Sequence, residues 1–255
     1  MRRERNKSRT LALVRILNRI GAGEDLRLVA KEVGRIAPEV GPGDLAAAED
    51  HLRRSGYSEA TVAQLFAALA LTRIYEQGRS RATGPVLEAG ILQTVTAEHV
   101  MFRSLAAELK RILADIRGLE HPSDTSLEFY RLAHAVHHLR AMNEHFDREE
   151  DVILPYLWRQ GWAGLCRAAA ADHVQLRAYI DKLTMLVVAV GELTLEEFQS
   201  HLAPAVAGFC HGLLEHLSFE DGLLWPFALV VIDDPAAWKT ITARCEEIGY
   251  CGVRT

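Results

Sequence analysis

Apolar residues recur every three or four positions along most of this chain, and alternation of apolar and polar residues in the manner of a β-strand is scarce. Val62, Leu65 and Phe66, for example, fall on one face of a helix with 3.6 residues per turn. Ala, Leu, Glu and Arg, which favour helices, are frequent in the same segments. The pattern therefore predicts an all-α protein.

The first 80 residues predict a small all-helical domain. Asp25 and Asp44 stand just before apolar periodic stretches, where an aspartate can cap a helix N-terminus. The Gly-Pro-Gly at 41–43 breaks the pattern between them, and the polar stretch 76–84 is typical of a linker. Helices are expected over about 10–20, 26–36, 45–55 and 58–75.

Residues 85–250 predict a second domain with longer helices. Four are expected, at about 85–117, 126–160, 162–190 and 194–224. Thr125 with Glu128 and Thr194 with Glu197 are capping-box signatures, and Pro204 is expected to kink or restart the last helix. Asp234 and Pro235 then start a closing helix that ends near Ile248. Long helices joined by short loops favour an up-down-up-down four-helix bundle.

Two sequence motifs occur twice in this second domain. His145-x-x-x-Glu149 and His216-x-x-x-Glu220 are each followed by a proline six residues after the glutamate. The sequence His-Val-x-apolar-Arg begins at His99 and again at His173, and each copy is preceded by an acidic residue, Glu98 or Asp172. The order of the two motifs repeats as well, so the domain contains a degenerate internal duplication that places one histidine of interest on each predicted long helix.

The duplicated residues form a plausible set of metal ligands. Positions i and i+4 of a helix lie on one face, so each His-x-x-x-Glu pair can reach the bundle core together. Ionised carboxylates are costly to bury unless they are paired or bind a cation. Two glutamates can bridge two ions while two histidines hold each ion, which favours di-iron, with manganese or zinc as alternatives. The predicted ligands are His99, His145, Glu149, His173, His216 and Glu220.

Neighbouring residues compete for these roles. Glu150 adjoins Glu149, and His211 with Glu215 forms another i, i+4 pair, but the duplication selects Glu149 and Glu220. His211 is expected at the surface. The alternative to a metal site is a metal-free helical interaction protein whose histidines simply pack in the core.

Three further side chains are expected close to the site. Arg103 and Arg177 follow their histidines by one turn, and each either forms an ion pair at the end of the bundle or orients a carboxylate ligand. His138 shares a helical face with His145 and either lines an access path, belongs to a weak second metal site with His134, or is simply solvated.

Composition limits the other functions that the chain can have. A net charge of −5 gives no signature of nucleic-acid binding, and no apolar run is long enough to span a membrane. The four cysteines include no Cys-x-x-Cys pair, which favours reduced thiols in a cytoplasmic protein. The basic N-terminal segment predicts an amphipathic helix, and the N-terminal domain is expected to contact a protein partner.

These motifs resemble the hemerythrin-like family of non-haem di-iron bundles. The resemblance rests on AEHVMFRSLAAEL, EHFDREEDVILPYL, ADHVQLRAYI and EHLSFEDGLLWP. It implies two iron ions, bridged by Glu149 and Glu220 and by an oxo or hydroxo group. His99 and His145 would then serve one iron, and His173 and His216 the other.

The chain is also similar to a bacterial subgroup of that family. Members of the subgroup have a helical N-terminal extension, a ligand helix like REEDVILPYL and a closing segment like AAWKTITARCEEIGYC, and they often continue into a PAS sensor domain.

The resemblance implies a function in small-molecule chemistry. The fifth histidine of oxygen-carrying members is absent, because Ala169 and Arg177 stand four residues either side of His173. We therefore expect binding or sensing of O2, NO or peroxide at a site with four histidines and two glutamates. The alternative is a di-iron enzyme, either an NO reductase or peroxidase, or an iron donor for iron–sulfur cluster repair. The N-terminal domain lacks the cysteine pair that repair proteins often carry there.

Overall fold

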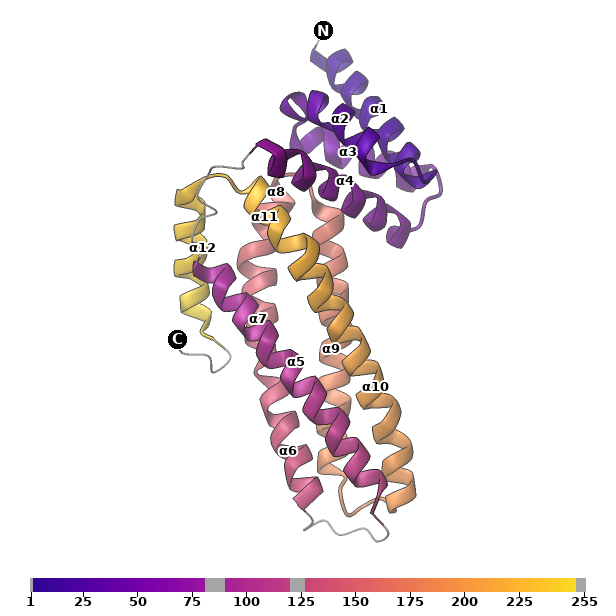
Figure 1. The fold of residues 1–255 in the computed structure, drawn as a ribbon, viewed down its shortest axis with the longest axis vertical. Helices are drawn as coiled ribbons and strands as arrows, with labels where there is room; N and C mark the ends of the chain where they lie inside the picture. Colours follow the sequence, from indigo (N-terminus) through magenta and orange to yellow (C-terminus); the bar gives the residue numbers. More distant parts are fainter. Residues whose placement is uncertain (1, 81–89, 120–126, 251–255) are drawn as a thin grey trace. The chain divides into compact units, whose positions relative to one another are not determined.

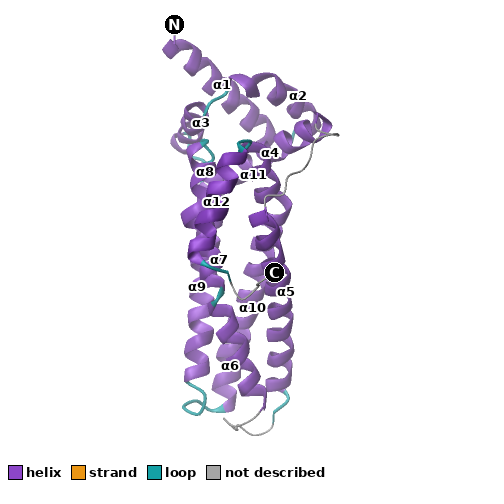
Figure 2. Cartoon of the chain, turned by 90° about the vertical axis from the view of Figure 1, so that its left-hand side faces the viewer, coloured by secondary structure: helices purple, strands orange, loops and turns teal. Residues whose placement is uncertain are grey.

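The computed structural model describes residues 2–80, 90–119 and 127–250, and within these ranges the regular elements are helices, with no strand (Figure 2). The predicted all-α fold is confirmed. No helix in the described ranges is both long and apolar enough to cross a membrane.

The chain divides into two compact units. The first contains the described residues of Met1–Ala89 together with Glu150–Ala170 and Phe219–Thr242. The second contains Gly90–Glu149 and Ala171–Ser218 with the described residues of Ala243–Thr255. The sequence places a domain boundary between residues 80 and 85, and that boundary stays a prediction.

The N-terminal helices of the first unit are α1 (Arg2–Gly21), α2 (Leu26–Ile36), α3 (Pro42–Arg54) and α4 (Glu59–Ser80) (Figure 1). Asp25 caps α2 as predicted, and its carboxylate accepts a hydrogen bond from the Arg27 amide at 2.8 Å. The same unit includes Trp162, whose ring packs in a T-shaped arrangement with Phe66 and with Phe227, at 5.9 Å and 4.4 Å between ring centres. These aromatic contacts join the later segments of the unit to its N-terminal helices.

The predicted N-cap role of Asp44 is wrong. Helix α3 begins at Pro42, which suits the first helical position because proline has a fixed φ and no N–H. Asp44 therefore lies one turn inside, where its carboxylate accepts from the Gly41 amide at 3.0 Å and from Arg9 at 3.0 Å. The predicted linker at 76–84 is also wrong in its first part, because α4 continues to Ser80; its remainder lies outside the described residues.

Four long helical stretches form the second unit. They belong to α5 (Gly90–Arg117), α6 (Leu127–Arg140) with α7 (Met142–Arg148), α9 (Ala163–Val188) and α10 (Leu195–Phe219) (Figure 1). Side chains from all of them share one core, which confirms the predicted four-helix bundle. This core includes Phe102, Leu109, Leu139, Phe146, Leu176, Leu183, Phe209 and Leu213.

The helix-start signals of the later helices have mixed outcomes. The capping box before α10 is confirmed, since the Thr194 amide donates to Glu197 at 3.0 Å and the Glu197 amide donates to the Thr194 hydroxyl at 3.2 Å. Asp234 caps α12 (Pro235–Ile248) through the Ala236 amide at 2.8 Å, also as predicted. Thr125 lies outside the described residues. Pro204 lies within α10, which does not restart there.

Two π-helical turns follow the helices that carry His145 and His216, a feature that the sequence pattern did not predict. They span Glu149–Ile153, before α8 (Leu154–Arg159), and Glu220–Leu224, before α11 (Trp225–Val231). Pro155 and Pro226 occupy the second position of the α-helix that follows each turn. Proline has no N–H and its ring clashes with the carbonyl four residues earlier. A wider turn relieves this clash, and such turns are frequent at functional sites.

The described cysteines are buried free thiols. Cys166, Cys210 and Cys245 form no disulfide in the structure, and the reduced state of the thiols in the cell stays a prediction. Burial raises the pKa of the Cys166 thiol to about 12 and that of Cys245 to about 11. Because the thiolate is the reactive form, these thiols are poor nucleophiles.

The turn at Gly161 generates a testable prediction for the first unit. Gly161 has φ +89°, and a Cβ there would lie 2.6 Å from the Pro42 carbonyl oxygen. We expect Gly161→Ala to lower the free energy of unfolding by more than about 1 kcal/mol. Gly43→Ala is the control, because Gly43 lies in α3 with no atom near that position, and it is expected to be neutral or mildly stabilising. Equal urea-denaturation midpoints for the two variants would contradict this account.

Candidate metal centre

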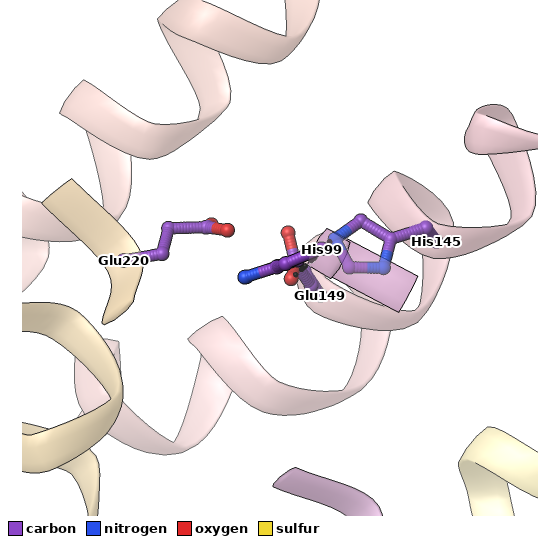
Figure 3. A group of neighbouring side chains, drawn as sticks. All are labelled: His99, His145, Glu149 and Glu220. Carbon is purple, nitrogen blue, oxygen red and sulfur yellow. Dashed lines mark hydrogen bonds and ion pairs between the residues drawn. The ribbon is translucent and has the colours of Figure 1, made fainter. Parts of the chain in front are cut away.

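Six buried side chains meet in two overlapping groups. The first group contains His99, His145, Glu149 and Glu220, and its ligand atoms all lie within 4.8 Å of one another (Figure 3). The second contains Glu149, His173, His216 and Glu220 under the same limit. The structure thus brings together the six residues that the sequence predicts as ligands.

The six residues come from the two copies of the two duplicated motifs, which we call the duplicated frame. His99 lies on α5, His145 on α7, His173 on α9 and His216 on α10. The two glutamates are the first residues of the two π-helical turns, and Glu220 continues directly from α10. Figure 3 shows the Glu220 carboxylate pointing toward His99 and Glu149 from the opposite side of the site. All six side chains are at most 1% exposed.

The four imidazoles form two pairs that face each other through Nε2. The Nε2 atoms of His99 and His145 are 3.3 Å apart, and those of His173 and His216 are 3.1 Å apart. Glu149 adjoins both pairs, because Oε1 lies 3.0 Å from His145 Nε2 and Oε2 lies 3.2 Å from His173 Nε2. One carboxylate therefore offers one oxygen to each histidine pair.

An acidic side chain orients one histidine in each pair. His145 Nδ1 donates to Glu98 Oε2 at 2.7 Å, and His216 Nδ1 lies 3.3 Å from Asp172 Oδ2. A neutral imidazole that donates from Nδ1 has a lone pair on Nε2. This is the usual arrangement of metal-binding histidines, in which a carboxylate sets the tautomer and the direction of the ring.

The electrostatics of the site call for a cation. Burial alone would raise the pKa of the Glu149 carboxyl, but positive charge and hydrogen-bond donation from the adjacent imidazoles of His145 and His173 outweigh it and hold that pKa well below its usual range. A metal ion bound to neutral imidazoles would supply the positive charge in their place. An ionised carboxylate thus lies beside the Nε2 atoms in a site with no solvent exposure. A metal ion satisfies carboxylate and imidazole lone pairs together, and a buried anion is costly without such a partner.

Aromatic rings pack against the histidines. The Phe146 ring stacks on His173 with 4.4 Å between centres, and Phe102 meets His145 edge-on at 4.9 Å. Phe102 occupies the apolar position of the His-Val-x-apolar-Arg motif, although its contact with a histidine was not predicted. These contacts restrict ring rotation and fill space that water would otherwise occupy.

The sequence interpretation missed the role of three charged residues. It recognised Glu98 and Asp172 as repeated acids but gave them no function, and it did not single out Arg148. Glu98 and Arg148 are both fully buried and form an ion pair. The duplication was the signal that could have identified the acids, since each lies immediately before a candidate ligand.

The side chains expected around the site have different surroundings. Arg177 pairs with Asp147 at 2.7 Å, and its guanidinium lies 5.2 Å from the centre of the Phe146 ring. Arg103 is half-buried, and an orienting role toward a carboxylate ligand stays a prediction for both arginines. His138 is exposed, with its Nε2 atom 3.3 Å from that of His134.

The competing residues lie outside both groups. His211 and Glu215 have side chains 74% and 72% exposed, so this i, i+4 pair is on the surface as predicted. Glu150 is only half-buried, whereas the adjacent Glu149 is completely enclosed.

Comparison with known families agrees with this geometry. The model of the hemerythrin HHE cation-binding domain matches residues 90–228, a range that contains all six residues of the two groups. A comparison with curated individual proteins finds no significant match. Because the domain match covers more than half of the chain, the protein belongs to the hemerythrin family.

Proposed function

We propose that this protein holds two iron ions at the six-residue centre and binds or senses a small molecule, O2, NO or peroxide, at them. The observation that carries the proposal is the position of Glu149, which offers one carboxylate oxygen to each of two histidine pairs. A single ion would need only one of the two groups. Two overlapping groups that share both glutamates suit a bridged pair.

The donor set supports a specific division of ligands. His99 and His145 would hold one ion, and His173 and His216 the other, with Glu149 and Glu220 bridging. Mixed imidazole and carboxylate ligation inside a helical bundle suits iron, and it also admits manganese or zinc. If each glutamate gives one oxygen to each ion, the protein supplies four donors per ion and leaves coordination positions for a small molecule.

The surroundings of the six side chains explain why the molecule bound at the centre would be small. All six side chains are buried, and Phe102 and Phe146 pack against the histidines from within the core. When bound, an iron pair supplies redox change and open positions. The protein's own residues orient the imidazoles through Glu98 and Asp172 and exclude bulk water.

Iron content and spectroscopy test the proposal directly. We expect about two irons per chain after reconstitution. The oxidised protein should show the near-ultraviolet absorption of an oxo- or hydroxo-bridged ferric pair, and NO should change the spectrum of the reduced protein. Less than one iron per chain would refute the di-iron assignment, and full loading without any response to O2, NO or peroxide would refute the binding role. Sustained turnover of NO or peroxide with a reductant would instead favour the enzyme alternative.

The bridging role of Glu149 is tested against its neighbour. Glu149→Gln replaces an ionised bridge by a neutral amide, so we expect the loss of both ions or the retention of one at most. Glu150→Gln changes the adjacent half-buried residue and should leave the metal content unchanged. Metal analysis after gel filtration measures both. A Glu149→Gln protein that keeps two ions with unchanged spectra would refute the bridge.

Two histidines on α10 provide a second matched pair. His216 is 1% exposed and belongs to a ligand group, whereas the His211 side chain is 74% exposed. We expect His216→Ala to lower the affinity for the second metal ion at least about tenfold, by analogy with losses at ligand-supporting residues. His211→Ala should bind metal like the wild type. Chelator competition distinguishes them, and equal affinities would exclude His216 as a ligand.

A further inference from the structure

Arg148 is a buried charge that contacts two distant parts of the second unit. Among the described residues it is the largest fully buried side chain, with an exposure of 0%. One of its terminal nitrogens donates to Glu98 Oε2, and the other donates to the backbone carbonyl of Gly249. Arg148 therefore joins α5 to the segment at the end of α12 from a position beside the metal centre.

The contact with Glu98 reaches the metal centre through one oxygen. Glu98 Oε2 accepts from Arg148 and also from His145 Nδ1, the latter at 2.7 Å. The position of that oxygen determines the orientation of the His145 ring. Because a buried guanidinium is costly unless it is paired, Arg148 and Glu98 each require the other in place. Arg148 is thus a positioning residue that acts on His145 through Glu98.

The contact with Gly249 secures residues 243–250, which we name the C-terminal segment. Gly249 has φ +102°, a conformation that favours glycine, and its amide donates to the Cys245 carbonyl at 3.2 Å. Cys245 is fully buried, and the Tyr250 ring centre lies 5.0 Å from the Arg148 guanidinium carbon. The segment therefore meets Arg148 through a carbonyl and an aromatic ring.

The buried arginine that pairs with Glu98 has no counterpart in the second copy of the motifs. The position equivalent to Arg148, three residues after the ligand histidine, is Phe219 in the second copy. The acid of that half, Asp172, has a side chain 46% exposed and lies farther from its histidine, at 3.3 Å. The fully buried arginine and its link to the C-terminal segment are thus additions to the repeated motif rather than part of it.

We propose that Arg148 couples metal binding at the His99–His145 half of the centre to docking of the C-terminal segment. This proposal rests on the proposed metal site. An ion on His145 Nε2 favours the ring orientation in which Nδ1 meets Glu98, and that position of Glu98 favours the Arg148 conformation that holds Gly249. Because coupling between two binding events is reciprocal, docking of the segment also strengthens metal binding at this half.

Hydrogen exchange in the 255-residue chain tests the coupling. In the wild type, iron loading should slow amide exchange in the C-terminal segment by about fivefold or more, the low end of typical coupling between sites. Arg148→Lys keeps the positive charge but lacks the fork that binds two acceptors at once. In that variant we expect the iron-dependent slowing in the segment to be lost. The exchange rates of the α6 amides should be the same as in the wild type, and they serve as an internal reference.

Two further variants keep the test decisive. Arg131→Lys is the control, because Arg131 also binds two carboxylates, Glu108 at 2.6 Å and Asp115 at 2.8 Å, within the same unit. It should retain the iron-dependent slowing. If Arg148→Lys does not fold, Gly249→Ala serves instead, since it displaces the carbonyl and leaves Arg148 and Glu98 unchanged. It should bind iron and lose the slowing.

The outcomes separate this proposal from the metal assignment. Iron content is measured on each sample, so a wild type that binds no metal refutes the proposed function itself. A wild type that binds two irons with no change in the segment overturns the coupling alone. Arg148→Lys or Gly249→Ala with slowing equal to the wild type also overturns it. A chelator should remove one of the two irons faster from Arg148→Lys than from Arg131→Lys. That result would support the reciprocal effect, in which docking of the segment strengthens metal binding.

Discussion

Lone pairs directed at one another in a dry core are the constraint on which the rest of this structure depends. Imidazole Nε2 atoms and carboxylate oxygens approach to 3.0–3.3 Å with no exposure to solvent. Such groups repel unless a proton or a metal ion lies among them. The apolar packing, the orienting acids and the helix distortions all maintain an arrangement that the chain would not otherwise favour. A metal ion at this centre would therefore have a structural role as well as a chemical one.

The helix distortions show how a simple repeat produces this arrangement. Each glutamate of the two His-x-x-x-Glu motifs begins a π-helical turn, and each turn is followed by a proline. The proline has no N–H for the ordinary helical ladder, so the wider turn and the proline belong together physically. The conspicuous spacing from glutamate to proline in the sequence is thus a backbone signal as much as a chemical one.

The sequence predicted the helices and the candidate ligands well because both follow from periodic or duplicated patterns. Thr194 and Glu197 form their capping box through residues three positions apart, and the candidate ligands stand out because their spacing occurs twice. The π-helical turns were not predicted, because one wide turn inside a long helix scarcely alters the spacing of the apolar residues. The Arg148–Gly249 contact was not predicted because it joins residues 101 positions apart in the sequence. Asp44 was misplaced because a proline at the first helical position outweighed the capping preference of aspartate.

The unequal acids give the two histidine pairs different electrical environments. Glu98 is sealed in the core with Arg148, whereas nearly half of the Asp172 side chain touches solvent. Water and salt screen charge at the Asp172 end, and the Glu98 end lies in a medium of lower effective dielectric. A change of one unit in the charge of the centre therefore produces a stronger field toward Arg148 than toward Asp172. The nearly symmetric sequence thus encodes a centre whose electric field is stronger on the Glu98 side than on the Asp172 side.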